Sequence, residues 1–396
     1  MIAVIADDFT GAAEIGGIGL RHGLDVIIET EPNKNNNADL VIIATDTRSL
    51  QANEASEQVT RITKSLLQLN PKFVFKKLDS VLRGNIREEL LAQMKVSGKN
   101  RAIVVAANPV FKRIIRDGIY YIDDIPLNET CFASDPQYAI RSSSVLEILG
   151  ANEKSILHNL KPDNELPETG LIIGDVSCFD DLEKWATRID EKTLVAGASG
   201  FFNAILEKQQ SCQTKKEKPK IPFGDKALYV LGSTYPKDIN LLKKIEANGH
   251  YLSNMPKEIY YNKNFDSYHL DQWVDDIVKG INTHRKVIAL MIHTRSNEPD
   301  ISLRIKENIG ELIKKVVERI DLNELLIEGG STTSVVLKYL GIKKLIPIQE
   351  LDTGVIRMVI EGAPDFCLTT KPGSYFWPDN VWIPQDIERF NNIAYE

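Results

Sequence analysis

Two adjacent aspartates near the start of the chain are the residues best suited to chemistry. Asp7 and Asp8 directly follow the apolar run 2–6, and Thr10 and Gly11 precede a segment of small residues. A strand, a polar turn and a helix in this order are typical of a parallel α/β sheet, in which ligands bind beyond the carboxyl ends of the strands. Adjacent carboxylates repel each other, so we expect a hydroxyl, a cation or an N–H group to contact them. The alternative is that one of them only caps the helix.

Three further polar clusters follow apolar runs in the same way. They are TDTRS at 45–49, KKLDSVLRGN at 76–85 and NPVFKR at 108–113. In a parallel sheet the carboxyl ends of the strands meet at one edge, which would gather these clusters. Arginine binds carboxylates through two N–H groups and aspartate accepts from hydroxyls, so the mixture suits a small polyol acid. The residues expected at this edge are Asp7, Asp8, Asp46, Arg48, Lys76, Lys77, Asp79, Ser80, Arg83, Asn108 and Arg113.

The segment KLDSVLRGN allows two interpretations. Gly84 would permit a tight turn, and Ser80 would cap a helix that opens nearby. The alternative is that Asp79 and Arg83 form only a surface pair at i,i+4 spacing, worth a few tenths of a kcal/mol.

Glycine-bearing turns follow strands in the second half of the chain. They are LGSTYP at 231–236, EGGSTTS at 328–334 and KPGSYF at 371–376. Small residues let backbone N–H groups approach phosphate oxygens, and a following helix adds its positive end. Neither GxxxxGK[ST] nor GxGxxG occurs, and one such turn alone is usually only a turn. Together the three turns favour a nucleotide site.

Apolar runs alternate with helical patterns along most of the chain, which predicts an α/β fold with largely parallel sheets. The lysine-rich segment 208–224 predicts a connector between a first domain at 1–207 and a second domain at 225–396. The alternative is a long surface loop within one domain. Residues 117–150 predict a hairpin excursion on the ligand face, and the tail from 364 predicts a wrapping segment. Expected strands are 2–6, 25–29, 40–44, 73–76, 102–106, 171–174, 193–196, 227–231, 287–292 and 324–328; expected helices are 11–23, 52–69, 86–97, 180–190, 236–247, 300–319 and 332–340.

The composition excludes several classes of protein. At 396 residues two domains are expected, and a net charge of −7 argues against a nucleic-acid partner. No apolar run reaches about 18 residues and no leader pattern is present, so neither a membrane span nor a signal peptide is expected. The cysteines are scattered and no HxxxH occurs, which predicts reduced thiols, a cytoplasmic protein and no protein-borne metal site. The cysteines are Cys131, Cys178, Cys212 and Cys367.

The motifs ADDFTGAAE, DTRS, KLDSVLRGN, NPVF and EGGSTTSVV, in this order, resemble the four-carbon acid sugar kinase family along the length of the chain. The resemblance implies two α/β domains with a cleft between them, the first for the acid sugar and the second for ATP. It implies acid-sugar contacts at Asp8, Arg48, Asp79, Ser80 and Arg83, and nucleotide contacts at Ser233, Gly354 and Gly373. The turn LGSTYPKD, Ser331 after the glycine pair and KPGSYFW depart from the family pattern.

The resulting hypothesis is in-line transfer of a phosphoryl group from Mg-ATP to the terminal hydroxyl of threonate, erythronate or an oxo-tetronate. Asp8 or Asp79 would orient the hydroxyl and accept its proton, and Mg²⁺ would be held mainly by the phosphates. Arg83, aided by Arg48, would clamp the substrate carboxylate. Alternatives are a non-catalytic sensor or a kinase of another hydroxy acid such as glycerate; a homodimer is left open. Further expected contacts are Asp7 and Asn108 for the sugar, and Gly329 and Gly330 for the nucleotide.

Overall fold

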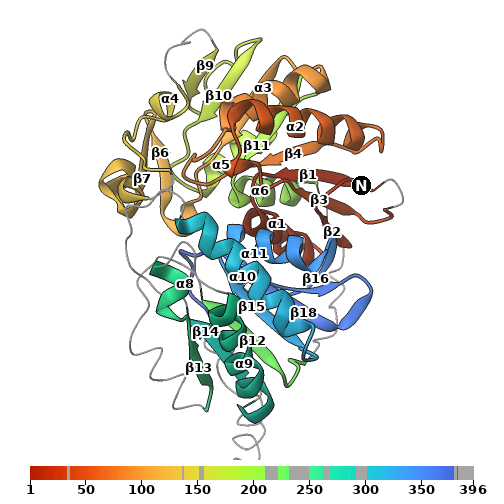
Figure 1. The fold of residues 1–396 in the computed structure, drawn as a ribbon. Coiled ribbons are helices and arrows are strands. Elements are labelled where there is room, and N and C mark those ends of the chain that lie inside the picture. The colour runs from red at the N-terminus through yellow and green to blue at the C-terminus, as the bar shows by residue number, and fades with distance from the viewer. Residues whose placement is uncertain are drawn as a thin grey trace, which may run out of the picture. The chain divides into compact units, whose positions relative to one another are not determined.

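The computed structural model divides the chain into two compact α/β units, Met1–Glu217 and Lys218–Glu396 (Figure 1). The predicted fold class of two α/β domains is confirmed. The division falls inside the expected connector 208–224, of which residues 210–221 lie outside the described residues. The domain limits 207 and 225 therefore stay predictions. The structure describes residues 1–33, 36–135, 138–150, 156–209, 222–231, 249–261, 267–284, 286–290, 301–378 and 381.

The first unit contains a parallel sheet with the order β2-β3-β1-β4-β11-β5-β10-β9 within the described residues. All five residues of β1 are buried, as expected for an apolar strand that is covered on both faces. The strands are β1 (Ile2–Ala6), β2 (Val26–Glu29), β3 (Leu40–Ala44), β4 (Val74–Lys77), β5 (Arg101–Val105), β9 (Leu157–Leu160), β10 (Gly170–Gly174) and β11 (Thr193–Gly197).

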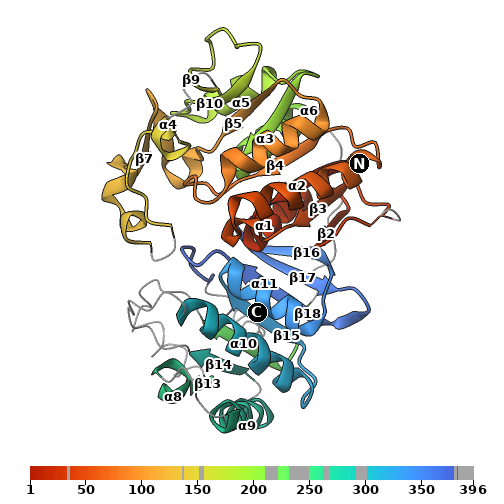
Figure 2. The ribbon, with the colours of Figure 1, turned by 45° about the horizontal axis from the view of Figure 1, so that its top comes forward.

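Helices cover both faces of this sheet (Figure 2). The helices α2 (Ala52–Leu67) and α3 (Ile86–Ser97) pack against each other on one face. The buried residues of α2 recur every three to four positions, as an amphipathic helix on a sheet requires. The other face carries α1 (Phe9–Arg21), α5 (Phe179–Thr187) and α6 (Ser199–Gln209).

A small antiparallel excursion interrupts the first unit. It contains β6 (Arg113–Arg116), β7 (Ile119–Ile122) and β8 (Ile125–Pro126), followed by the short helix α4 (Val145–Ile148). The hairpin expected within 117–150 is confirmed, although it begins four residues earlier. Backbone hydrogen bonds of 2.9 Å in both directions between Ile115 and Val176 tie the excursion to the segment after β10.

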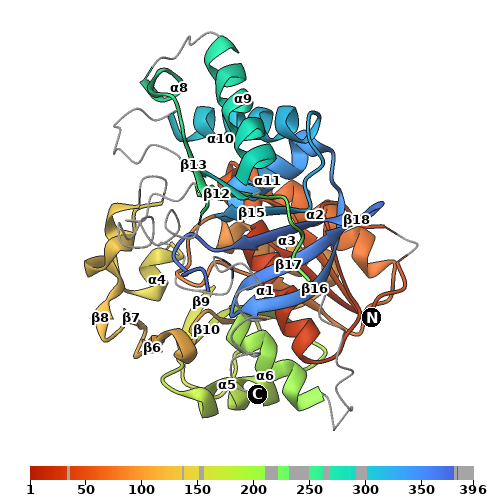
Figure 3. The ribbon, with the colours of Figure 1, turned by 90° about the horizontal axis from the view of Figure 1, so that it is seen from below.

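The second unit contains a sheet with the order β13-β14-β12-β15-β18-β17-β16 among the described strands. The first five are parallel, and β17 and β16 are antiparallel to their neighbours. The helices α9, α10 and α11 lie together on one side of these strands (Figure 3). The elements are β12 (Ala227–Leu231), β13 (Tyr251–Asn254), α8 (Lys257–Tyr261), α9 (Ser267–His284), β14 (Lys286–Leu290), α10 (Ile301–Val317), β15 (Glu324–Glu328), α11 (Gly330–Leu340), β16 (Lys344–Asp352), β17 (Val355–Ile360) and β18 (Ala363–Lys371).

The prediction of a wrapping tail from 364 is wrong for residues 364–371. They belong to β18, which pairs with β15 on one side and with β17 on the other. The buried second half of β18 is an interior part of the sheet. Beyond the strand, Trp377 and Val381 pack against the buried cluster around Tyr229, as expected of a wrapping segment. The expected helix 236–247 lies outside the described residues.

Within the described residues, no helix is both long and apolar enough to cross a membrane.

Candidate functional site

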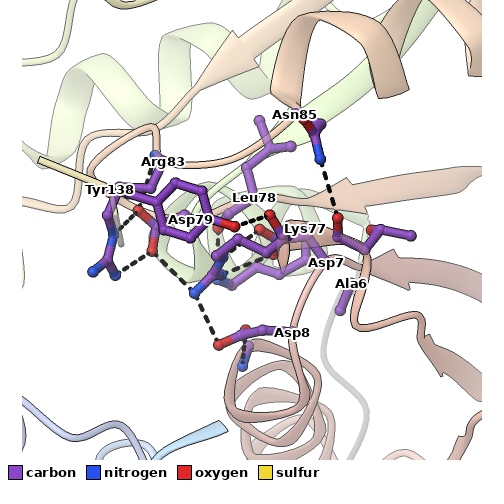
Figure 4. A network of polar contacts seen from close by, with 12 residues as sticks. Ala6, Asp7, Asp8, Lys77, Leu78, Asp79, Arg83, Asn85 and Tyr138 are labelled. Atoms are coloured by element: carbon purple, nitrogen blue, oxygen red, sulfur yellow. Dashed lines mark hydrogen bonds and ion pairs between the residues drawn. The ribbon is translucent and has the colours of Figure 1, made fainter. Parts of the chain in front are cut away.

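The carboxyl edge of the first sheet gathers the polar clusters that follow β1, β3 and β4. Thr45, after β3, donates its backbone N–H to the carbonyl of Ala6 at the end of β1, at 2.9 Å. The Asn85 amide, after β4, donates to the carbonyl of Thr47 at 3.2 Å. These contacts hold the loops side by side and bring Asp7, Asp8, Arg48, Asp79 and Arg83 into one network (Figure 4).

Arg48 is the centre of this network. Its Nε and Nη2 donate to the two oxygens of Asp7 at 2.8 and 3.0 Å. Its Nη1 donates to Oδ2 of Asp8 at 3.0 Å and lies 3.5 Å from Oδ1 of Asp79. Burial opposes the charge of the guanidinium, but these carboxylates outweigh it and hold the pKa of Arg48 well above its usual value. The repulsion expected between Asp7 and Asp8 is therefore offset by one shared cation.

Asp8 both caps α1 and takes part in the network. Its Oδ1 accepts from the backbone N–H of Gly11 at 2.8 Å, and its Oδ2 accepts from the hydroxyl of Thr10 at 2.8 Å. Burial raises the pKa of Asp8, but the charges of Arg48 and Lys77 outweigh burial and lower it below its ordinary value. A Cβ at Gly11 would lie 2.7 Å from Oδ1 of Asp8, so a larger residue here would displace the Asp8 carboxylate.

Asp79 and Arg83 pair within a tight, buried turn. Nε and Nη2 of Arg83 donate to the two oxygens of Asp79 at 2.9 and 2.8 Å. The turn needs left-handed backbone at Leu82 and Gly84, with φ of 63° and 90°. The Asp79 side chain is only 7% exposed, so the interpretation as a surface pair is wrong. Burial raises the pKa of Asp79, but Arg83 and Arg48 outweigh it and hold the pKa far below its usual range.

Ser80 does not cap a helix, which corrects that expectation. The residue before α3 is Asn85, and the Ser80 hydroxyl accepts a hydrogen bond from Nη1 of Arg113. The carbonyl of Ser80 accepts from the hydroxyl of Tyr120 at 2.6 Å. Ser80 therefore joins the network to the excursion.

Asn108 lies three residues after β5, and its amide donates to the Ser199 hydroxyl at 3.1 Å. Its Oδ1 is buried without a hydrogen-bond partner. Its backbone pairs with that of Arg113 in both directions, at 2.8 and 3.1 Å.

The expectation that Lys76 lies at this edge is wrong. Its Nζ is fully buried on the opposite face, 2.6 Å from Oε2 of Glu89 on α3. Lys77 points the other way, 3.5 Å from Glu14 on α1, because successive side chains of a strand alternate between the faces. Asp46 precedes the turn at Thr47–Ser49 in left-handed backbone and is partly exposed.

The excursion supplies residues that the sequence did not single out. Nη1 of Arg83 donates to Oδ2 of Asp135 at 2.8 Å, and the Tyr138 hydroxyl donates to the carbonyl of Arg48. The guanidinium of Arg83 lies 5.2 Å from the ring centre of Phe132. The sequence predicted that 117–150 packs on the ligand face, but this prediction did not identify any single residue of the excursion as part of the site.

The second unit gathers three glycine turns at one edge of its sheet. Glu328, at the end of β15, pairs with Lys371, at the end of β18. Because β17 is antiparallel to β18, the turn with Gly354 lies at this same edge. Gly329 has φ of 98° and leads into α11, whose N-terminus has no side-chain cap. Gly330 is the first residue of α11 and Gly373 follows β18; Ser233 lies outside the described residues.

Lys371 organises this edge, a role that the sequence did not indicate. Its Nζ donates to Oε1 of Glu328 at 2.7 Å and to the carbonyl of Tyr375 at 2.6 Å. Burial lowers the pKa of Lys371, and Glu328 opposes this shift. The ring of Tyr375 in turn packs on Gly354, where a Cβ would lie 2.7 Å from it. The loop 372–376 is thus fixed to β15 and to the Gly354 turn.

Neither edge contains a recognisable metal site within the residues that the structure describes. Across the described ranges, no group of three or more His, Cys, Asp or Glu side chains could hold a metal ion. The uncapped N-terminus of α11 instead offers backbone N–H groups, which suit phosphate oxygens.

Family models match both halves of the chain. A sugar-binding N-terminal domain matches residues 2–205, and a nucleotide-binding C-terminal domain matches residues 239–375.

Curated relatives include kinases of four-carbon acids. The chain is 36% identical to a D-threonate kinase of Salmonella typhimurium over 149 residues, which is 37% of this chain and 35% of that enzyme. It is 26% identical to a D-erythronate kinase of Heliobacterium modesticaldum over 86% of this chain and 85% of that enzyme. A 3-oxo-tetronate kinase of Haemophilus influenzae is 27% identical over 54% of this chain and 49% of that enzyme. The first and third matches thus span a third to a half of those enzymes.

Solved structures share the fold. A Haemophilus influenzae protein from a family of unknown function superposes with a TM-score of 0.69 and 19% identity, covering 95% of this chain and 97% of that one. A Salmonella typhimurium protein described as a putative tRNA synthase superposes with a TM-score of 0.73 and 18% identity, covering 95% and 96%.

Proposed function

The chain belongs to the four-carbon acid sugar kinase family, and from this premise we propose that it transfers the γ-phosphoryl group of ATP to the terminal hydroxyl of a four-carbon acid sugar. The observation that carries the proposal is the buried network of carboxylates and guanidinium groups at the carboxyl edge of the first sheet. Relatives are named for D-threonate, D-erythronate and 3-oxo-tetronate, and these acids are the proposed substrate class.

Asp8 is the proposed acceptor of the hydroxyl proton. Its side chain is 13% exposed, compared with 7% for Asp79 and 4% for Asp7, so a substrate reaches it most easily. Both Asp8 and Asp79 are ionised at neutral pH because their pKa values are lowered. Asp79 already binds Arg83 through both oxygens, so it serves better to position the guanidinium groups. A weak base suffices, because phosphoryl transfer depends mainly on positioning and charge stabilisation.

The remaining predicted residues take supporting roles in this proposal. Asp7 holds Arg48 through both carboxylate oxygens and so fixes the centre of the network. Ser80 and Asn108 lie beside Arg113 and offer polar groups to the substrate hydroxyls.

ATP is proposed to bind at the glycine-bearing edge of the second unit. Gly329 and Gly330 open α11, and its uncapped N–H groups would contact phosphate oxygens. Gly354 and Gly373 would let the backbone approach the nucleotide closely, and Ser233 is proposed as a further nucleotide contact. Mg²⁺ would neutralise phosphate charge, and we assign it no ligand among the described side chains.

We propose a cytoplasmic location, because the four cysteines are widely scattered along the sequence and their spacing does not suggest a disulfide framework. All residues named for the reaction come from one chain, so the proposal does not depend on whether a homodimer forms.

Coupled ADP release with D-threonate, D-erythronate and 3-oxo-tetronate tests the proposal. We expect turnover with at least one of these acids, at a rate well above that with glycerate. Calorimetry with the same acids provides the second measurement. Binding of an acid without any turnover, by a folded chain, would refute the kinase and favour a sensor.

A further inference from the structure

Arg113 differs from the other arginines at the carboxyl edge of the first sheet. Arg48 is paired with Asp7 and Asp8, and Arg83 with Asp79 and Asp135. Arg113, the first residue of β6, is half-buried, and its Nη1 donates to the hydroxyl of Ser80.

Arg113 has aromatic neighbours. Its guanidinium lies 5.9 Å from the ring centres of Phe111 and Phe132. Within the part of the chain that the structure describes, no carboxylate lies within ion-pair distance of Arg113. A partly desolvated guanidinium is best stabilised by an anion that it binds through two N–H groups.

The surroundings of Arg113 connect it to the proposed reaction site. Ser80, its hydrogen-bond partner, directly follows Asp79 in the chain. Phe132 is near two guanidinium groups, with its ring centre 5.2 Å from that of Arg83 and 5.9 Å from that of Arg113. Backbone hydrogen bonds to Asn108 fix the start of β6 against the end of β5. The backbone of Arg113 is therefore fixed by its two hydrogen bonds to Asn108, and Arg113 lies at the same edge of the sheet as Asp8.

We infer that Arg113 binds the carboxylate of the acid sugar and thereby determines the preference for acids over neutral polyols. The inference rests on the proposed function, because it names the group that recognises the proposed substrate. In this inference Arg48 and Arg83 do not form the carboxylate clamp that was expected from the sequence. They are paired with the chain's own acids, and Arg113 supplies the charge that the substrate carboxylate requires. Ser80 orients Arg113 through its hydroxyl.

Substrate preference of an Arg113→Met variant tests this inference. We compare kcat/KM for the acid sugar with that for its primary amide, which has the same carbon chain without the charge. The variant is expected to lose about 100-fold on the acid and less than about threefold on the amide, with the KM for ATP unchanged. Arg113→Lys restores the charge without the planar fork and should recover about tenfold. Arg116→Met is the matched control, since Arg116 lies on the same strand but is exposed, and it should behave as the wild type.

A second measurement on the wild-type chain does not depend on folding of a variant or on turnover. Phenylglyoxal modifies accessible guanidinium groups, and peptide mass spectrometry locates the label. We expect D-threonate or D-erythronate to protect Arg113, and the neutral polyol erythritol to give no protection. Protection without turnover would support the inference while the proposed kinase activity fails. Turnover with an unchanged acid-to-amide ratio in Arg113→Met, or failure of every acid to protect Arg113, would overturn the inference.

Discussion

Replacing Asp79 with asparagine should destabilise the first unit by about 3 kcal/mol at pH 7. The substitution preserves shape but removes the charge that Arg83 binds at 2.8 and 2.9 Å and that lies 3.5 Å from Arg48. The side chains of Asp79 and Arg83 are only 7% and 19% exposed, so water compensates little for the loss. Removing one partner of a buried ion pair typically costs about 3–5 kcal/mol. We take the lower end because the amide oxygen of the substituted side chain still accepts one hydrogen bond.

The pH dependence of this loss gives a second signature. The pKa of Asp79 is lowered in the folded chain relative to its ordinary value of 3.8. Its charge therefore contributes stability that is fully present above that ordinary pKa and is lost as the pH falls through the folded pKa. The difference between wild type and Asp79→Asn should stay constant from about pH 7 to about pH 5. Below the ordinary pKa it should shrink by up to about 1.4 kcal/mol per pH unit.

Urea-dependent hydrogen exchange of the amides in β1 and β4, read by mass spectrometry, isolates the opening of the first unit from that of the second. Asp163→Asn is the control, because its carboxylate is 81% exposed and lies 3.4 Å from Lys184. Exposed pairs contribute little, so the control should show no measurable change. A loss below about 1 kcal/mol for Asp79→Asn, or a loss equal to that of the control, would refute the account of a buried network that depends on this charge.

Two further substitutions separate the proposed roles of the two edges. Asp8→Asn should lower kcat at least about 100-fold, since Asn also caps helices well but cannot accept the proton; a kcat within about threefold of wild type would contradict this. It should also destabilise the first unit, because it removes a charge that pairs with Arg48 at 3.0 Å. Gly354→Ala should raise the KM for ATP about tenfold, because it adds left-handed backbone strain and a Cβ 2.7 Å from the Tyr375 ring. Gly362→Ala has similar strain at φ of 83° with no atom within 4 Å, so its KM for ATP should not change, and equal effects in both variants would exclude the contact with Tyr375 as the cause.

The sequence predicted the carboxyl edge of the first sheet because its strands are continuous apolar runs that end in polar clusters. Parallel pairing then brings Asp8, Arg48 and Asp79 together without any knowledge of side-chain conformations. The exception was Lys76, which was assigned to the edge by its position at the strand end. Alternation along β4 instead sends it to Glu89 on the opposite face. Partners such as Asp135 could not be predicted, because the path of an excursion depends on tertiary packing.

The second unit was predicted less completely, for identifiable reasons. The helix α9 buries Leu270, Trp273, Val274 and Ile277, which recur at helical spacing. The sequence therefore indicated this helix, although it is absent from the expected helices. The strand β18 starts with four residues that are exposed or only partly buried, and only its second half is buried. Its alternation is therefore weak, although it is an interior strand. The antiparallel pair of β16 and β17 has no βαβ pattern, so the alternation of strands and helices did not indicate it.

The pairing of Arg48 and Arg83 in the structure limits how a substrate carboxylate can bind. Arg83 binds Asp79 through its Nε and Nη2. To bind a substrate carboxylate through the same two groups, Arg83 would have to release Asp79, whose carboxylate would then be buried without its main partner. The cost, about 3–5 kcal/mol, is comparable with the whole gain from one new charge-assisted pair. Binding at Arg113 breaks no ion pair between described residues and adds an anion where none is present. A network whose acids and guanidinium groups are already paired is also preorganised, so the charges around Asp8 need not rearrange when the phosphoryl group is transferred.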